Sequence, residues 1–130
     1  MNKRSFGKTG ENTAAIYLEN KGFTIVGHNV YVGKAEIDLI AKNENFFLFV
    51  EVKTRRQRPE SNSFYGRPGS ALNYNKKIHL LAAAEGYLHM HPDISGSLQP
   101  RIDLIEVYVD PSSETYRVLD IVHIPNAVHK

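Results

Sequence analysis

The chain has 130 residues and no cysteine, with 42% hydrophobic and 23% charged residues and a formal net charge of +2. This composition is typical of one folded domain and excludes a disordered chain, a disulfide scaffold and a thiolate zinc site. No apolar run approaches the about 18 residues of a membrane-spanning helix, and no signal peptide follows the basic N-terminus, so we expect a cytoplasmic protein without membrane contacts.

The N-terminal segment has the pattern of an amphipathic helix over residues 7–20. Apolar side chains recur at helical spacing, Thr9 or Gly10 can begin the helix, and Gly22 can end it. Glu11 then lies in the first turn, where the helix dipole favours an acidic side chain by about 0.3–1 kcal/mol. This local role is one interpretation of Glu11, and a functional role is the other.

Three strands joined by short turns are predicted next, over residues 23–32, 35–41 and 46–53. The first is expected to kink near residues 27–29, the second alternates between polar and apolar residues, and the third is apolar through Val50. A continuously apolar strand is typical of the buried centre of a sheet. The short turns make these three strands an antiparallel meander.

The C-terminal half adds a long polar loop, a second helix and two more strands. Their expected ranges are 55–70 for the loop, 73–89 for the helix, and 101–109 and 115–124 for the strands. The third and fourth strands are expected to be parallel, because a helical crossover joins them. We therefore predict an α/β fold in the order αβββαββ, with helices flanking a mixed central sheet of about five strands. Residues 1–130 form a single domain with a core over about 6–124 and a flexible tail over 125–130.

Two charged residues, Glu51 and Lys53, end the most hydrophobic strand and project from the same face of it. Because an unpaired buried charge costs several kcal/mol, they either pair with each other, reach solvent or bind a ligand. Asp38 comes level with about residue 50 across the ladder if the intervening turn is centred on Glu44, so Asp38 and Glu51 can be neighbours. Adjacent carboxylates repel, and a divalent cation such as Mg²⁺ or Mn²⁺ removes that conflict.

Asp38 followed by Glu51-Val52-Lys53 resembles the PD-(D/E)xK nuclease signature of restriction-endonuclease-like folds. Glu11 matches an extra acidic residue found in the Holliday-junction-resolvase branch of that superfamily. The order of several short segments is similar to that of the YraN family of predicted endonucleases, over residues 6–109. These segments are Gly10-Glu11, Tyr17-Leu18, Lys21-Gly22-Phe23, Glu36-Ile37-Asp38-Leu39-Ile40-Ala41, Phe49-Val50-Glu51-Val52-Lys53-Thr54-Arg55, Tyr65-Gly66-Arg67-Pro68 and Arg101-Ile102-Asp103.

Two positions depart from the family pattern. Ala35 stands where the family usually has glycine, and Ile37 stands where a proline often precedes the first aspartate. A small residue is retained at the first position, and the proline is not a metal ligand. We therefore expect no loss of chemistry from either departure.

The resemblance implies a set of catalytic residues, Glu11, Asp38, Glu51 and Lys53. Asp38, Glu51 and the main-chain carbonyl of Val52 would hold Mg²⁺ or Mn²⁺, weakly bound in the absence of substrate, and Glu11 would bind the ion directly or through water. Lys53 would act on the attacking water. Glu36 shares a strand face with Asp38, and we expect it to lie outside the ligand set or in solvent.

The charge of the chain is concentrated in one basic segment. Residues 53–77 include seven basic residues and one acidic residue, a net charge of +6, so the rest of the chain carries −4. Such a segment either contacts nucleic acid or is a solvated loop. In a nuclease, its side chains would contact phosphates. The candidates are Arg55, Arg56, Arg58, Arg67, Lys76 and Lys77. Asp103, beside Arg101, is expected to form a structural ion pair.

Three functions remain open from the sequence. The first is a Mg²⁺-dependent endonuclease of branched or damaged DNA, and the second is a nucleic-acid-binding module that retains the nuclease fold without cleaving. The third is a structural or partner-binding domain. The intact set of acids with Lys53 favours the first function, and the basic segment disfavours the third. DNA is expected rather than RNA, and a homodimer is expected only by analogy with junction resolvases.

Overall fold

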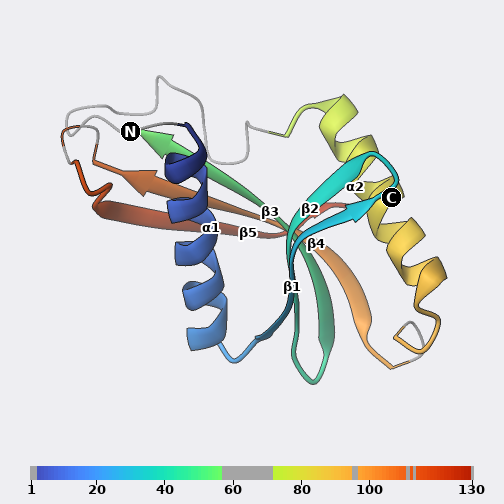
Figure 1. The fold of residues 1–130 in the computed structure, drawn as a ribbon. Coiled ribbons are helices and arrows are strands. Elements are labelled where there is room, and N and C mark those ends of the chain that lie inside the picture. Colours follow the sequence, from blue (N-terminus) through green and yellow to red (C-terminus); the bar gives the residue numbers. More distant parts are fainter. Residues whose placement is uncertain (1–2, 57–71, 95–96, 111, 113, 130) are drawn as a thin grey trace.

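A five-stranded mixed sheet lies between two helices in the computed structural model, which describes all residues except 1–2, 57–71, 95–96, 111, 113 and 130 (Figure 1). The elements are α1 (Lys3–Asn20), β1 (Thr24–Val32), β2 (Ala35–Lys42), β3 (Phe46–Arg56), α2 (Tyr74–Met90), β4 (Gln99–Val109) and β5 (Val118–Val128). The strands are adjacent in the order β1-β2-β3-β4-β5. The predicted α/β fold and its element order are confirmed.

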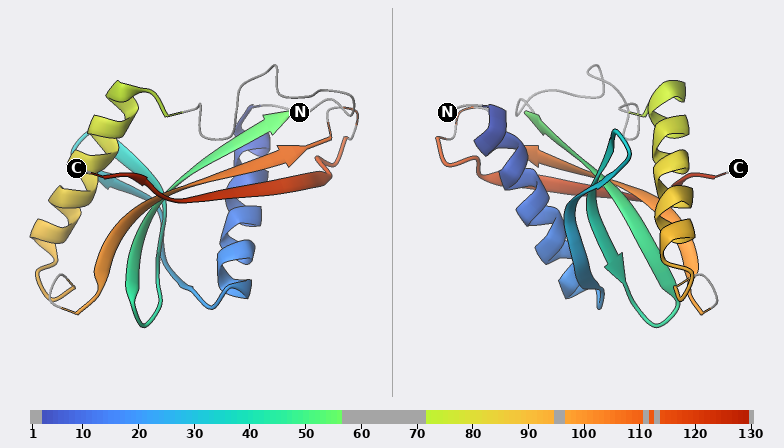
Figure 2. Two further views of the ribbon diagram at one scale, coloured as in Figure 1. Left: turned by 180° about the vertical axis from the view of Figure 1, so that it is seen from behind. Right: turned by 45° about the vertical axis from the view of Figure 1, so that its right-hand side comes forward.

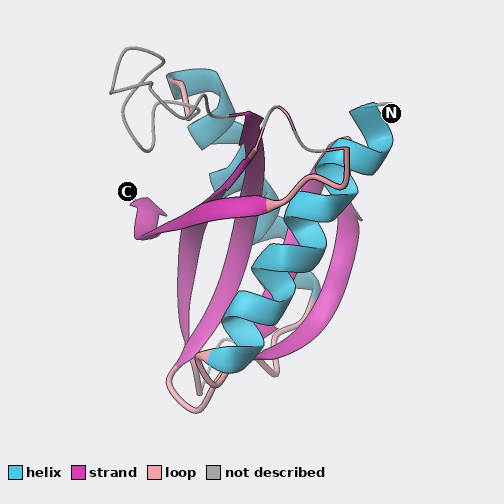
Figure 3. Cartoon of the chain, turned by 90° about the vertical axis from the view of Figure 1, so that its left-hand side faces the viewer, coloured by secondary structure: helices cyan, strands magenta, loops and turns pink. Residues whose placement is uncertain are grey.

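Each face of the sheet is covered by one helix, as two further views show (Figure 2). In β3, Leu48 and Val50 belong to the core under α1, while Phe47 and Phe49 belong to the core under α2. Figure 3 shows α1 lying across the near face of the sheet. The unbroken apolar run of β3 is therefore explained, because both of its faces are buried. Neither described helix is long and apolar enough to cross a membrane.

The crossover through α2 makes β3 and β4 parallel, as the sequence predicted. Their register runs from Phe46 opposite Gln99 to Arg56 opposite Val109, and the other neighbouring strands pair in antiparallel fashion. The predicted kink in β1 corresponds to a register shift between Ile25 and Gly27. Asn73 caps α2 by accepting a 2.9 Å hydrogen bond from the Lys76 backbone N–H.

Several predicted boundaries were wrong. β3 continues through Arg55 and Arg56, two residues of the predicted loop, and β5 begins at Val118. α1 begins at Lys3, with the Phe6 ring packed edge-on against Tyr116 at a centroid separation of 5.3 Å. Glu11 therefore lies in the middle of the helix, and its interpretation as a first-turn acid fails. β5 continues to Val128, which is buried and paired with Ile102, so the strand runs past residue 124 into the predicted tail.

The extension of β5 past Pro125 has a simple physical reason. β5 is the last strand in the sheet order, so one of its edges has no neighbouring strand. A proline lacks the backbone N–H, and an edge strand tolerates that loss because the outward-facing group has no ladder partner. Proline in the sequence was therefore a poor indicator of the end of this strand.

Strands β2 and β3 pair over only part of their length. Their ladder runs from Lys42 opposite Phe47 to Leu39 opposite Val50. Beyond this point the start of β2 stays paired with β1, while β3 continues beside β4. The sheet therefore forks immediately after the Leu39–Val50 pair, and the candidate functional residues lie at this fork.

Candidate functional site

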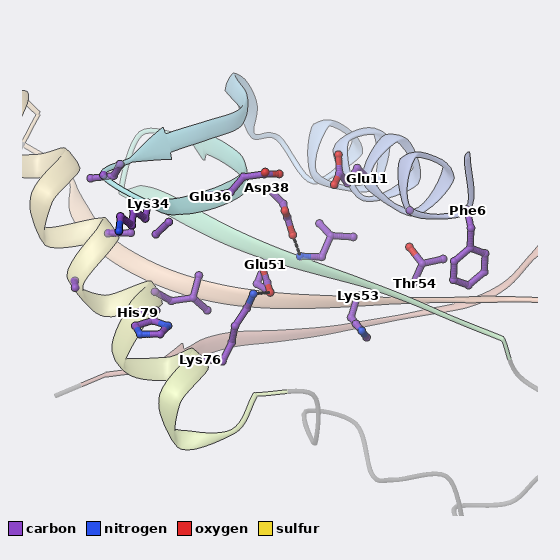
Figure 4. A pocket seen from close by; sticks show the side chains of 18 residues that line it. Phe6, Glu11, Lys34, Glu36, Asp38, Glu51, Lys53, Thr54, Lys76 and His79 are labelled. Atoms are coloured by element: carbon purple, nitrogen blue, oxygen red, sulfur yellow. Dashed lines mark hydrogen bonds and ion pairs between the residues drawn. The ribbon is translucent and has the colours of Figure 1, made fainter. Parts of the chain in front are cut away.

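The fork brings together the two acids that ladder counting predicted to be neighbours. The β2–β3 ladder ends at the Leu39–Val50 pair. Asp38 and Glu51 are the next residue on each strand, where the two strands part. The Asp38 carboxylate accepts a 2.8 Å hydrogen bond from the backbone N–H of Val52 (Figure 4). This side-chain bond satisfies a backbone donor at the place where the β2–β3 ladder has ended.

Asp38 is in an environment that disfavours its charge. Burial, followed by the neighbouring carboxylate of Glu51, raises the pKa of Asp38 to about 8, against the lowering effect of the Val52 hydrogen bond. Glu51 in turn forms a 2.8 Å ion pair between its Oε2 and the Nζ of Lys76. The hydrogen bond to Glu51 raises the pKa of the Lys76 ammonium above its ordinary value. At neutral pH the Asp38 carboxyl is therefore largely protonated, and Lys76 offsets the charge of Glu51.

A second group of acids approaches Asp38 from the other side. One carboxylate oxygen each of Glu11, Glu36 and Asp38 lie within 4.8 Å of one another. Glu11 comes from α1 and Glu36 from β2, and Figure 4 shows both on the side of Asp38 away from Lys76. Glu36 therefore lies with the candidate ligands, closer than the sequence predicted. Glu51 contacts Asp38 without belonging to this trio.

Asn29 holds the two outer acids together. Its side-chain amide donates hydrogen bonds to Glu11 (3.1 Å) and to Glu36 (2.9 Å). Asn29 has a positive φ of 49°, a conformation in which asparagine is enriched among non-glycine residues. The sequence analysis missed this residue. The predicted kink of β1 near residues 27–29 was the signal that could have pointed to it.

These residues line an open groove with a volume of about 1200 Å³. One wall comes from the N-terminal half of α1, including Phe6, and the other from the N-terminal half of α2, including His79. Four carboxylates and three lysines line it, namely Glu11, Glu36, Asp38, Glu51, Lys34, Lys53 and Lys76. Within the described part of the chain, the exposed Lys53 ammonium has neither a hydrogen-bonded nor an ion-paired partner.

The donor set is of the type that binds a hard divalent cation. Its candidate side-chain ligands are all carboxylates, and the main-chain carbonyl of Val52 stays a predicted ligand. Such oxygen donors suit Mg²⁺ and Mn²⁺ rather than softer metals. The mutual repulsion of Asp38 and Glu51 is the electrostatic feature that a bound cation relieves. Glu11, Glu36 and Asp38 are close enough to share such an ion, and Glu51 lies next to Asp38 on the other side.

The predicted phosphate-contacting residues divide into separate groups. Arg55 forms a 2.8 Å ion pair with Glu106, which is fully buried. The Arg56 guanidinium lies 5.0 Å from the centre of the Phe6 ring. Neither arginine lines the groove, and neither does Lys77, whereas Lys76 does. Arg58 and Arg67 lie outside the described residues.

The predicted ion pair of Asp103 is confirmed and extended. Arg101 donates two hydrogen bonds to the fully buried Asp103 carboxylate, at 2.8 and 2.9 Å. His123 Nε2 lies 2.7 Å from the same carboxylate, and the Asn126 backbone N–H donates to it at 3.0 Å. None of these residues is among those that line the groove around Asp38.

Comparison with known proteins places the chain in a family. The profile of the uncharacterised protein family UPF0102 matches residues 10–107. A UPF0102 protein of Caldanaerobacter subterraneus subsp. tengcongensis is 37% identical over 127 residues, which are 98% of this chain and 97% of that protein. UPF0102 proteins of Caldicellulosiruptor saccharolyticus and Clostridium acetobutylicum are 37% and 36% identical over 127 residues, covering 98% of this chain and 99% and 95% of the relatives. The chain belongs to the uncharacterised protein family UPF0102, the YraN family that its motifs predicted.

Proposed function

We propose that the protein is a metal-dependent endonuclease that hydrolyses phosphodiester bonds of DNA. One observation carries this proposal, namely that the fork between β2 and β3 brings Asp38 and Glu51 together in the groove that Lys53 also lines. Carboxylates that hold a divalent cation, with a lysine lining the same groove, are a set that can support metal-assisted phosphodiester hydrolysis. The resemblance to the PD-(D/E)xK signature supports the same assignment.

The charge of the groove supports a polyanionic substrate that binds together with a metal ion. With Asp38 largely protonated, the other three carboxylates of the groove balance its three lysines, so the groove without a cation does not attract a polyanion. A divalent cation that displaces the Asp38 proton gives the groove a net positive charge. DNA binding and cation binding should therefore favour each other, because the cation supplies the positive charge that the phosphate needs.

The residues divide the work of hydrolysis among them. Asp38 and Glu51 would hold a Mg²⁺ or Mn²⁺ ion, with Glu11 and Glu36 as further oxygen donors on the far side of Asp38. When bound, such an ion lowers the pKa of a coordinated water and neutralises charge that develops on the phosphate. Lys53 would orient the attacking water with its ammonium. The water oxygen bonds to phosphorus as one P–O ester bond breaks, and one proton of the water ends on the leaving oxygen, so the products are a phosphate end and a hydroxyl end.

A nuclease assay with matched variants tests the proposal. Linear, flapped and four-way-junction DNA are incubated with the protein and Mg²⁺ or Mn²⁺, and the resemblance to junction resolvases makes the four-way junction the first substrate. Asp38→Ala and Lys53→Ala should abolish cleavage. Glu44→Gln and Lys42→Ala are the matched controls, because both residues are exposed and neither lines the groove.

Each outcome of this assay has a distinct meaning. Cleavage that survives both Asp38→Ala and Lys53→Ala would reject the proposed site. Salt-dependent DNA binding without cleavage of any substrate would favour the non-cleaving binding module. No DNA binding at low salt would favour a structural or partner-binding domain.

A further inference from the structure

The first turn of α2 breaks a general rule of helix electrostatics. A helix N-terminus carries a partial positive charge, which favours acidic side chains and disfavours lysine. The first turn of α2 nevertheless contains Lys76 and Lys77 and no acid. Such local conflicts are expected where a residue serves a function rather than stability.

The two lysines have different surroundings. Lys76 lines the groove, and its Nζ lies 2.8 Å from Oε2 of Glu51. Figure 4 shows the Lys76 side chain reaching from α2 across to Glu51, on the opposite side of the site from Glu11. Lys77 is exposed and does not line the groove. Two adjacent residues of the same type therefore form a natural pair of test and control.

We propose that Lys76 is a positioning residue that couples cation binding to DNA binding. In the metal-free protein the Lys76 ammonium is ion-paired with the Glu51 carboxylate. When a divalent cation takes Glu51 as a ligand, the Lys76 ammonium is displaced and contacts a backbone phosphate of the DNA. This inference rests on the proposed function, because it assigns Glu51 to the cation and the groove to the substrate.

The accessibility of the two partners supports this exchange. The Lys76 side chain is 46% exposed and attached to a long flexible stem, while the Glu51 side chain is only 12% exposed. Lys76 can therefore move towards solvent and a substrate, whereas Glu51 stays at the fork. A cation and Lys76 compete for the same carboxylate, and like charges at this distance repel. Coupling of this kind is reciprocal, so DNA strengthens cation binding by the factor by which the cation strengthens DNA binding.

The first test measures Mn²⁺ affinity without DNA, from the electron paramagnetic resonance signal of free Mn²⁺. Lys76→Met removes the competing ammonium and should tighten Mn²⁺ binding by at least about fivefold, the lower end of typical coupling between sites. Lys77→Met, which removes the same charge one residue away, should change the affinity by less than about twofold. Lys76→Gln must reproduce Lys76→Met, which excludes an effect of one particular side chain on folding.

The second test measures the affinity for a short labelled DNA duplex in EDTA and in Ca²⁺, a cation chosen to occupy the site without supporting cleavage. In EDTA, Lys76→Met should bind DNA as the wild type does, because Lys76 is held by Glu51. In Ca²⁺ it should bind at least about fivefold more weakly than the wild type. Lys77→Met should lower the affinity by equal factors in both conditions.

The inference is overturned if Lys76→Met leaves Mn²⁺ affinity unchanged or weakens it. It is also overturned if this variant loses DNA affinity equally in EDTA and Ca²⁺, since Lys76 would then be an ordinary phosphate contact. A wild-type protein that cleaves DNA together with either of these results rejects only the role of Lys76. A wild-type protein and a Lys76→Met variant that bind neither Mn²⁺ nor DNA reject both this inference and the proposed function.

Discussion

The Val52 backbone N–H donates a 2.8 Å hydrogen bond to Oδ2 of Asp38 at the point where β2 and β3 part. One side chain therefore has two roles at the fork. The Asp38 side chain accepts from a backbone N–H that has no partner in the β2–β3 ladder, because that ladder has ended. It also presents a partly desolvated carboxylate next to Glu51. The first role stabilises the fold and needs only an oxygen atom, whereas the second needs a negative charge.

Asp38→Asn and Asp38→Ala should separate these two roles. Asparagine keeps an acceptor for Val52 and removes the repulsion with Glu51, so its free energy of unfolding without metal should equal or exceed that of the wild type. Alanine leaves the Val52 N–H without its partner and should lower that free energy by about 1–3 kcal/mol. Both changes should reduce cleavage by at least about a hundredfold. Urea unfolding and the nuclease assay measure the two effects, and an active Asp38→Asn variant would contradict the assignment of Asp38.

Gly10 is required by the close approach of α1 to β3. A Cβ atom at Gly10 would overlap the Thr54 hydroxyl, whereas a Cβ at Gly7 would have no atom within 4 Å. Gly7→Ala should therefore stabilise the protein by about 1 kcal/mol through helix propensity. Gly10→Ala should destabilise it by about 1–3 kcal/mol through overpacking.

The double variant Gly10→Ala/Thr54→Ala provides the control for this contact. Removing the Thr54 hydroxyl makes room for the new methyl group, so the double variant should recover most of the stability lost in Gly10→Ala. A double-mutant cycle from urea unfolding measures the coupling. If the two changes are additive, the Thr54 contact does not explain why glycine is needed.

The sequence predicted the part of the site that depends on strand pairing. Asp38 and Glu51 are joined by a single tight turn, and side chains alternate with a fixed period along strands. Counting from a turn centred on Glu44 placed Asp38 level with about residue 50. The ladder pairs Leu39 with Val50, one residue away from that register, so Asp38 and Glu51 are the next residue on each strand. The same local rules identified the order of the elements. They failed at the start of α1 and the end of β5, where packing of Phe6 and Val128 extends each element.

The sequence could not place the parts of the site that depend on tertiary packing. Glu11, Asn29 and Glu36 meet because α1 docks against one end of the sheet and β1 bends with β2 away from β3. Lys76 reaches Glu51 because α2 packs on the opposite face. The residue pattern within one helix or strand does not specify how that element packs against the others. The basic composition of residues 53–77 likewise did not show that Arg55 is bound to a buried acid.

The Asp103 network should give the protein a defined acid sensitivity. Burial raises the pKa of Asp103, but hydrogen bonds from His123, Arg101 and Asn126 outweigh burial and hold that pKa below its ordinary value. A lowered folded-state pKa stabilises the protein above the unfolded-state value of about 4, and this contribution is lost as the pH falls through and below it.

Asp103→Asn isolates this contribution, because the other carboxylates are common to both proteins. Near pH 5 the variant should be less stable by about 3 kcal/mol, since the Arg101 guanidinium loses its charged partner. The difference should narrow as the pH falls below about 4. Urea unfolding across this range measures it, and a difference that stays constant down to the lowest pH would argue against a lowered pKa of Asp103.

Arg55 should prove to be a structural residue, although the sequence placed it among the phosphate contacts. Glu106 is fully buried, and Arg55 holds it at 2.8 Å, with the Tyr108 hydroxyl 3.4 Å from its other oxygen. Arg55→Met should therefore lower the free energy of unfolding by about 2–4 kcal/mol, because a buried carboxylate loses a charged partner. Arg56→Met, which removes the cation–π contacts of Arg56 with Phe6 and Tyr116, should cost about 0.5–1 kcal/mol.

The double variant Arg55→Met/Glu106→Met distinguishes folding from DNA binding. Apolar residues of similar volume can replace a buried ion pair with little loss of stability, so this variant should recover most of what Arg55→Met loses. If Arg55 does not contact DNA, the double variant should also bind DNA with wild-type affinity and an unchanged salt dependence. A double variant that folds stably but binds DNA more weakly, with a shallower salt dependence, would return Arg55 to the phosphate-binding surface, because loss of a phosphate contact reduces the number of counterions released.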